Sequence, residues 1–442
     1  MSAGIETLSR RGAVYATPPN PMGNYKEIPQ DTYDPETNPT GFINIGTSDN
    51  HAMAPDIAAY LESNPPTMKS KDLMYGEGPF GCSRLRSAMA GYVNRYFNPH
   101  KAVNPDDIYF ANGCGSVCEA LGYTIFDDGD ALLISQPNYV GFPHDFGAKS
   151  RVSLYHVPFH GTDSFDPLCT VKYEAALNSA TAAGIKIRAV LLVNPHNPLG
   201  LCYPQETLIA IMRFCNKHCL HLISDEIYAL SIYNPSPAPY EPPTPFTSVL
   251  SIDYARHIDP NLLHVMYGLS KDFAASGIRI GCLIVRNPAL MDALMAVSQS
   301  HWPGIADQMV GVKILENVEW VEHFRLLNSE RLAERSAYAR KAFEGKGIPY
   351  DGRANAGFFL WVDLRKWLPK VDESGEKVEG WESERVLVRR WKAKKVILTA
   401  GEDQSAEEPG FFRVVFSQQE KVLQEGLRRV FEVLDDILER HM

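Results

Sequence analysis

Short apolar runs alternate with helical patterns between residues 105 and 300, and this alternation limits the fold more than any other feature of the chain. The runs are too short for helices and are rich in Val, Ile, Leu and aromatic residues. Strands that alternate with helices form right-handed crossovers, which build a mostly parallel sheet with helices on both faces. The expected strands are 108–111, 131–135, 151–157, 187–193, 220–224, 262–268 and 279–285.

The two ends of the chain differ from this α/β body. Residues 1–65 are rich in Pro, Gly and Asn, which indicates an N-terminal arm that supplies part of a small domain. Residues 311–442 mix long amphipathic helices with short strands, a pattern typical of a smaller α+β domain. Residues 66–310 then form the large domain. A chain of 442 residues with 45% hydrophobic content can bury both cores.

Charge and cysteine usage limit the partners and the compartment. A formal net charge of -10 argues against nucleic acid and against an anionic membrane surface, since both reward clustered Lys and Arg. No segment has the apolar length that a bilayer requires. The eight cysteines have no framework spacing, which favours reduced thiols and predicts a cytoplasmic protein.

Polar residues follow several of the expected strands, where ligands bind in sheets of this kind. Asp225 follows the run LHLIS. It is either a helix cap or a buried carboxylate that holds a cationic partner, because an unpaired buried charge is costly. In the turn NPHNPLG, 194–200, the prolines and the glycine explain the turn, whereas the amide of Asn197 is free to project toward a ligand.

A further group of residues suits a phosphate and an aldehyde. NGCGS, 112–116, opens a helix with small residues that let backbone N–H groups approach an anion, although such turns also occur without one. Ser270 and Arg279 are two more donors. Lys271 is either an ordinary solvated lysine or a desolvated one with a lowered pKa, able to form a Schiff base with an aldehyde. A carboxylate for a ring nitrogen, an amide for a ring oxygen, a group of phosphate donors and an amine for an aldehyde together describe a site for pyridoxal phosphate.

One segment offers a competing metal site. CNKHCLH places Cys215, His218 and Cys219 on one helix face, with His221 just beyond. No second pair of ligands is evident, so a half-buried helix packed on the sheet is the preferred interpretation, and no metal is expected.

Taken together, these motifs give the chain a family resemblance. It resembles the fold-type I pyridoxal-phosphate enzymes of the class I/II aminotransferase superfamily and, within it, fungal-type members of the aminocyclopropane-carboxylate synthase-like branch. The similarity runs from GFINIGTSDN to FFRVVFS. It implies an aminotransferase-like α/β large domain with a smaller α+β domain, pyridoxal 5'-phosphate as cofactor, an amino-acid substrate, and a homodimer with shared active sites.

The resemblance also implies a role for each motif residue. Lys271 would bind the cofactor as a Schiff base and take the substrate proton, Asp225 would pair with the ring nitrogen, and Tyr139 would stack on the ring. The other implied contacts are Asn197 and Tyr228 to the ring oxygen; Cys114, Gly115, Ser116, Ser270, Arg279 and the partner subunit's Tyr75 to the phosphate; and Arg413, Asp49 and Gly46 to the substrate.

Three positions depart from the family pattern. His196, in NPHNPLG, stands where the plant synthases often have a serine. Gly268 stands where the family has a serine two residues before the Ser-Lys pair, which removes one phosphate contact. Asp49 is one methylene shorter than the acidic residue of the plant synthases. That difference weakens the case for S-adenosylmethionine as the substrate.

The sequence leaves three functions open. Carbon–sulfur lyase chemistry, which eliminates a sulfur leaving group from the β or γ carbon of an amino acid or cysteine conjugate, is the first choice and fits secondary metabolite biosynthesis. An aminotransferase is the second. A catalytically silent, ligand-sensing scaffold is the third, and the retention of Lys271, Asp225, Asn197, Tyr228 and Arg413 argues against it.

Overall fold

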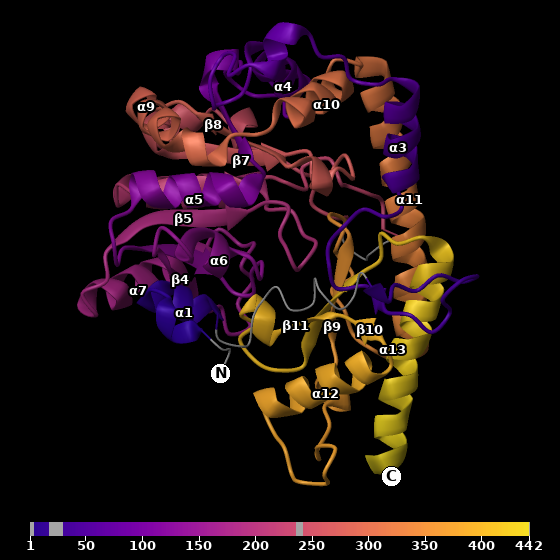
Figure 1. Ribbon diagram of the computed structural model, residues 1–442. Helices are drawn as coiled ribbons and strands as arrows, with labels where there is room; N and C mark the ends of the chain where they lie inside the picture. Colours follow the sequence, from indigo (N-terminus) through magenta and orange to yellow (C-terminus); the bar gives the residue numbers. More distant parts are fainter. Residues whose placement is uncertain (1–3, 17–29, 236–241, 442) are drawn as a thin grey trace.

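The structure is a computed structural model that describes residues 4–16, 30–235 and 242–441 (Figure 1). A seven-stranded sheet with helices on both faces forms one part, and two small sheets with long helices form the other. The predicted α/β class is confirmed. Part of the predicted arm, 1–3 and 17–29, lies outside the described residues, and the division into 1–65, 66–310 and 311–442 stays a prediction.

The large sheet contains the predicted strands. Only β8 runs antiparallel to its neighbours, which are β2 and β7, and the other pairings are parallel. Each apolar run expected from the sequence overlaps one strand. In spatial order the strands are β2 (Ile108–Asn112), β8 (Ile280–Val285), β7 (Leu263–Gly268), β6 (His221–Asp225), β5 (Ile187–Val193), β3 (Ala131–Ser135) and β4 (Ser153–Val157).

Alternate residues of each strand enter two separate cores, because successive side chains point to opposite faces. In β3, Leu132 and Ile134 join one core, whereas Ala131 and Leu133 join the other. The first core lies under α5 (Cys114–Ile125), α6 (Phe142–Gly147) and α9 (Pro288–Val297). The second lies under α4 (Ser83–Tyr96), α7 (Cys169–Ala182), α8 (Gln205–Lys217) and α10 (Ile305–Leu315).

The second part of the molecule places the arm against the C-terminal strands. β1 (Ile43–Asn44) pairs in parallel with β10 (Val396–Ile397). The antiparallel sheet has the order β11 (Thr399–Ala400), β12 (Phe411–Val415), β9 (Phe359–Asp363). The other α-helices of the described residues are α1 (Arg10–Ala16), α3 (Ala54–Ser63), α11 (Val318–Gly345), α12 (Trp381–Ala393) and α13 (Glu420–His441). Figure 1 shows α11 running along the side of the molecule from α10 to α13.

No helix in the described ranges combines the length and apolar character needed to cross a bilayer.

The start of α5 rests directly on β8. A Cβ atom at Gly281 would lie 2.5 Å from the backbone nitrogen of Cys114, which is closer than real side chains approach. Glycine at this position therefore sets how near the helix N-terminus comes to the sheet.

We expect Gly281→Ala to lower the free energy of unfolding by about 2 kcal/mol, because overpacking displaces backbone rather than a flexible side chain. Urea unfolding measures the change. Gly91→Ala is the matched control: it lies in α4, where a Cβ meets nothing within 4 Å, so it should stabilise by about 0.5–1 kcal/mol. Equal stability of the two variants would contradict this account of the α5–β8 contact.

Candidate active site

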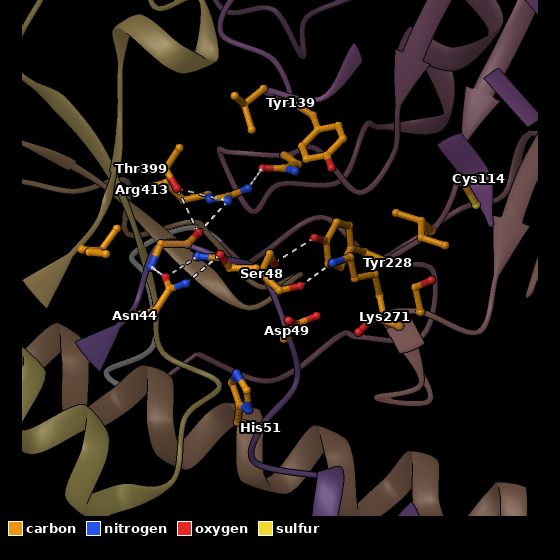
Figure 2. A pocket seen from close by; sticks show the side chains of 18 of the residues that line it. Asn44, Ser48, Asp49, His51, Cys114, Tyr139, Tyr228, Lys271, Thr399 and Arg413 are labelled. Atoms are coloured by element: carbon orange, nitrogen blue, oxygen red, sulfur yellow. Dashed lines mark hydrogen bonds between the residues drawn. The ribbon is translucent and has the colours of Figure 1, made fainter. Parts of the chain in front are cut away.

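A cavity of about 950 Å³ lies where the carboxyl edge of the large sheet meets the arm and the small antiparallel sheet (Figure 2). Parallel strands all end at this edge, and the reversed direction of β8 brings its first residues there too. The predicted site residues that line it are Gly46, Asp49, Cys114, Gly115, Tyr139, Asn197, Asp225, Tyr228, Ser270, Lys271, Arg279 and Arg413.

Lys271 follows β7 and points into this cavity. Its Nζ donates a hydrogen bond to the backbone carbonyl of Ser48, on the arm (Figure 2). Burial lowers the pKa of the Lys271 amine to about 8, and the nearby carboxylate of Asp49 opposes that shift. About a tenth of the amine is therefore neutral and nucleophilic at pH 7, far more than for an ordinary lysine.

Asp225 is the last residue of β6 and is only 6% exposed. Its Oδ1 accepts a 3.2 Å hydrogen bond from the backbone N–H of Ile227, and burial raises the pKa of the carboxyl to about 7. Residues 227–230 form a turn, so the helix-cap alternative is wrong. A cationic group beside Asp225 would offset the cost of burying its charge.

Tyr228 and Asn197 are each held by a side-chain hydrogen bond. The Tyr228 hydroxyl lies 2.9 Å from Ser48 Oγ, and its ring makes edge-to-face contacts with the rings of Phe358 and Phe359. Asn197 Oδ1 accepts a 2.8 Å hydrogen bond from Arg413 Nη1. Both residues thus present polar atoms to the cavity from fixed positions.

Arg413 lies in β12 and is 2% exposed. Its Nη2 donates to the Gly46 carbonyl at 2.7 Å, while its Nε, also buried, has no hydrogen-bond partner. In the described part of the chain, no carboxylate forms an ion pair with this guanidinium, and burial lowers its pKa. A buried cation with an unused donor is suited to a carboxylate ligand, which its planar fork can bind with two hydrogen bonds.

The N-terminus of α5 and Arg279 form a second anion-binding region. Gly113 has φ of +81° and caps the helix, so that Cys114 and Gly115 present backbone N–H groups to the cavity. The Arg279 guanidinium packs against this turn: a Cβ at Gly113 would lie 2.8 Å from its Cζ. A helix N-terminus beside an arginine is a favourable phosphate site.

Packing accounts for the departure at Gly268. A Cβ atom there would lie 2.6 Å from the Ile280 carbonyl oxygen on the neighbouring strand β8. The serine of the family pattern has no room in this chain, so the phosphate region depends on the remaining donors.

Two predicted site residues do not line the cavity. Ser116 lies further along the first turn of α5, with its backbone N–H bonded to the Gly113 carbonyl at 3.1 Å. Tyr75 is 86% exposed, with its ring 5.8 Å from that of Trp302. Its predicted contact with a partner subunit stays a prediction.

Several lining residues were not singled out from the sequence. Ser48 and His51 belong to the arm, Thr399 to β11, and Asp145 to α6. Burial raises the pKa of Asp145 to about 6. The only available signal was proximity to a motif: Ser48 precedes Asp49, and Asp145 follows Tyr139 by six residues.

The histidines and cysteines of the segment CNKHCLH do not converge on one point. His218 Nε2 lies 2.9 Å from a Glu174 oxygen, whereas His221 faces His264 at 2.9 Å. Cys215 is buried in α8. Across residues 4–16, 30–235 and 242–441, no group of three His, Cys, Asp or Glu side chains has the arrangement of a metal site.

Comparisons with known proteins place this site in context. The family model for aminotransferase class I and II matches residues 42–430. The chain is 33% identical over 438 residues to the mouse (Mus musculus) probable inactive 1-aminocyclopropane-1-carboxylate synthase-like protein 2, covering 97% of this chain and 72% of that protein. It is 32% identical over 418 residues to mouse 1-aminocyclopropane-1-carboxylate synthase-like protein 1, covering 93% and 80%.

Among solved structures, Thermus thermophilus aspartate aminotransferase with maleate is similar, with a TM-score of 0.72. The two chains are 21% identical, and the match covers 96% of this chain and 99% of the other. This similarity confirms the predicted aminotransferase-like fold.

The lowered pKa of Lys271 predicts how its aldehyde capture depends on pH. Only the neutral amine adds to a carbonyl, so capture of pyridoxal phosphate by cofactor-free protein should rise about tenfold per pH unit up to about pH 8 and then level off. An ordinary lysine would level off only near about pH 10.4. Stopped-flow absorbance measures the rate, with Lys271→Ala as the control. A rate that keeps rising tenfold per unit above pH 9 would contradict the shift.

Proposed function

Because this chain belongs to the class I and II aminotransferase family, with pyridoxal 5'-phosphate as its cofactor, we propose that it is a carbon–sulfur lyase. Such an enzyme removes the α-proton of an amino acid and eliminates a sulfur leaving group from the β or γ carbon. The observation that carries the proposal is the convergence of Lys271, Asp225 and Arg413 on one cavity. The predicted synthase-like branch is confirmed as well, while the fungal-type assignment stays a prediction.

The residues present fit this cofactor. Asp225 is a buried carboxylate that lacks a cationic hydrogen-bond partner among the described residues, as a protonated ring nitrogen requires. We assign the phosphate to the backbone of Cys114 and Gly115 with Ser270 and Arg279, while the contact from Ser116 stays a prediction. Asn197 and Tyr228 are assigned to the ring oxygen and Tyr139 to the ring face. Gly141 leaves room for Tyr139, because a Cβ there would lie 2.6 Å from Cζ of the tyrosine ring.

Each of the three converging residues then has a chemical task. The bound cofactor supplies an electron-withdrawing ring that stabilises negative charge at the α carbon. Asp225 holds positive charge on the ring nitrogen, which keeps that withdrawal strong. The Lys271 amine, with its pKa near 8, takes the α-proton as general base. Arg413 orients the amino acid through its α-carboxylate.

The charges that line the cavity support elimination over transfer to a dicarboxylate acceptor. The lysine and arginine residues in the described lining are Lys271, Arg279 and Arg413, and each has an assigned partner. The part of the cavity beside Lys271, which would hold the substrate's side chain, instead contains the carboxylate of Asp49. An uncharged, sulfur-containing side chain is better accommodated there than a second carboxylate.

Activity is proposed although one relative is named as probably inactive. That name applies to the mouse protein. In this chain Arg413 remains a buried cation with an unused donor, which is costly unless an anion binds. A silent ligand-sensing scaffold could also bind an anion there, so the argument against it is the joint retention of Lys271, Asp225 and Arg413, any of which a silent site could lose.

We further propose a cytoplasmic homodimer with shared active sites. All eight cysteines are free, which suits a reducing compartment. Leu73, Met74 and Tyr75 are 66%, 72% and 86% exposed, an apolar strip that a second subunit would cover. Tyr75 would then reach the partner subunit's phosphate region.

The direct test is a substrate screen without added 2-oxo acid. Purified protein should convert S-substituted cysteines or homocysteines, with water, into equal amounts of thiol, ammonia and 2-oxo acid. Lys271→Ala should lose the visible absorbance band and about 10³-fold or more of the turnover. Product formation that requires an added 2-oxo acid would establish an aminotransferase instead, and absence of the visible band from wild-type protein would overturn the assignment.

Arg413→Lys tests substrate orientation. A lysine keeps the charge but loses the second parallel hydrogen bond, so KM should rise about 10- to 100-fold with a smaller change in kcat. Steady-state kinetics measure both parameters. Arg365→Lys, at an exposed arginine paired with Asp363, should leave them unchanged. An unchanged KM in Arg413→Lys would exclude Arg413 as the carboxylate ligand.

A further inference from the structure

Ser48 lies on a part of the arm that is anchored on both sides. On one side of it, the Gly46 carbonyl accepts hydrogen bonds from Arg413 at 2.7 Å and from Thr399 Oγ1 at 2.9 Å. On the other side, the Asp49 carbonyl accepts from Ser417 Oγ at 2.8 Å. Ser48 itself is 5% exposed. Its backbone and side chain are therefore held in one position relative to the cavity.

From this position Ser48 contacts two of the groups assigned to the cofactor. Its carbonyl accepts from Lys271 Nζ, and its Oγ lies 2.9 Å from the Tyr228 hydroxyl (Figure 2). Either Ser48 or Tyr228 can be the donor in the bond between their hydroxyls. When Tyr228 donates its proton to another acceptor, only Ser48 can be the donor in this pair.

A hydroxyl that receives a hydrogen bond becomes a stronger donor, because hydrogen bonds in a chain polarise one another. The effect is largest where water is excluded. Tyr228 is 2% exposed, and its ring makes edge-to-face contacts with the rings of Phe358 and Phe359. Among the described residues, its hydroxyl has a side-chain hydrogen bond to Ser48 alone.

We infer that Ser48 is a positioning residue which, through Tyr228, strengthens the hydrogen bond to the cofactor's ring oxygen. This inference rests on the proposed function, since it requires Tyr228 to face that oxygen. Donors to the ring oxygen favour the form that has lost its proton, because that form carries more negative charge there. Loss of the Ser48 hydroxyl therefore raises the pH at which the visible absorbance band titrates.

The experiment is a spectrophotometric pH titration of the protein with its cofactor bound. Ser48→Ala should move the midpoint upward by roughly half a pH unit, the equivalent of one neutral hydrogen bond. Ser48→Cys keeps the size but donates weakly, so its midpoint should move in the same direction. Ser417→Ala is the matched control: it removes a hydroxyl from the neighbouring anchor without touching Tyr228, and should shift the midpoint by less than about 0.2 unit.

A double-mutant cycle separates this role from a structural one. In a Tyr228→Phe background, Ser48→Ala should add no further shift, because the phenol through which it acts is gone. An unchanged midpoint in both Ser48 variants, or a shift that persists without the Tyr228 hydroxyl, would overturn the inference alone. A wild-type protein without any visible band would instead overturn the proposed function, and this inference with it.

Discussion

The cavity depends on the guanidinium of Arg413, because its hydrogen bonds join three segments that are remote in the sequence. Arg413 comes from the small antiparallel sheet. It donates to the Gly46 carbonyl of the arm and to Asn197, in the turn that follows β5. A Cβ at Gly46 would lie 2.9 Å from the Leu398 carbonyl carbon. Glycine therefore allows the arm to approach β11 closely enough for this bond to form.

Two buried charged side chains give the site its preference for a ligand that carries both a positive and a negative group. Asp225 and Arg413 are both nearly inaccessible, and burial acts on them in opposite senses: it raises the pKa of the carboxyl and lowers that of the guanidinium. Each charge is costly without a partner. A ligand with a cationic ring at one end and a carboxylate at the other offsets both costs, so the energy that destabilises these side chains contributes to binding.

Much of the fold was predictable because its signal is local. Each strand of the large sheet is a short apolar run, and a strand buried on both faces needs no partner to be recognised. Lys271, Asp225 and Asn197 followed from the rule that ligands collect at strand ends. Ser48, Thr399 and Asp145 were missed for the opposite reason: an isolated serine, threonine or aspartate in a polar segment carries no periodicity that marks it.

The sequence by itself determined the order of strands along the chain, the residues at their ends and, through the resemblance of its motifs, the cofactor. Only the tertiary structure decided that Asp225 is buried and that a turn, not a helix, follows it. The structure also showed that a side chain at Gly268 would collide with Ile280, and that Ser48 contacts both Lys271 and Tyr228. Those facts depend on contacts between residues far apart in the chain, and such contacts follow from packing rather than from local preference.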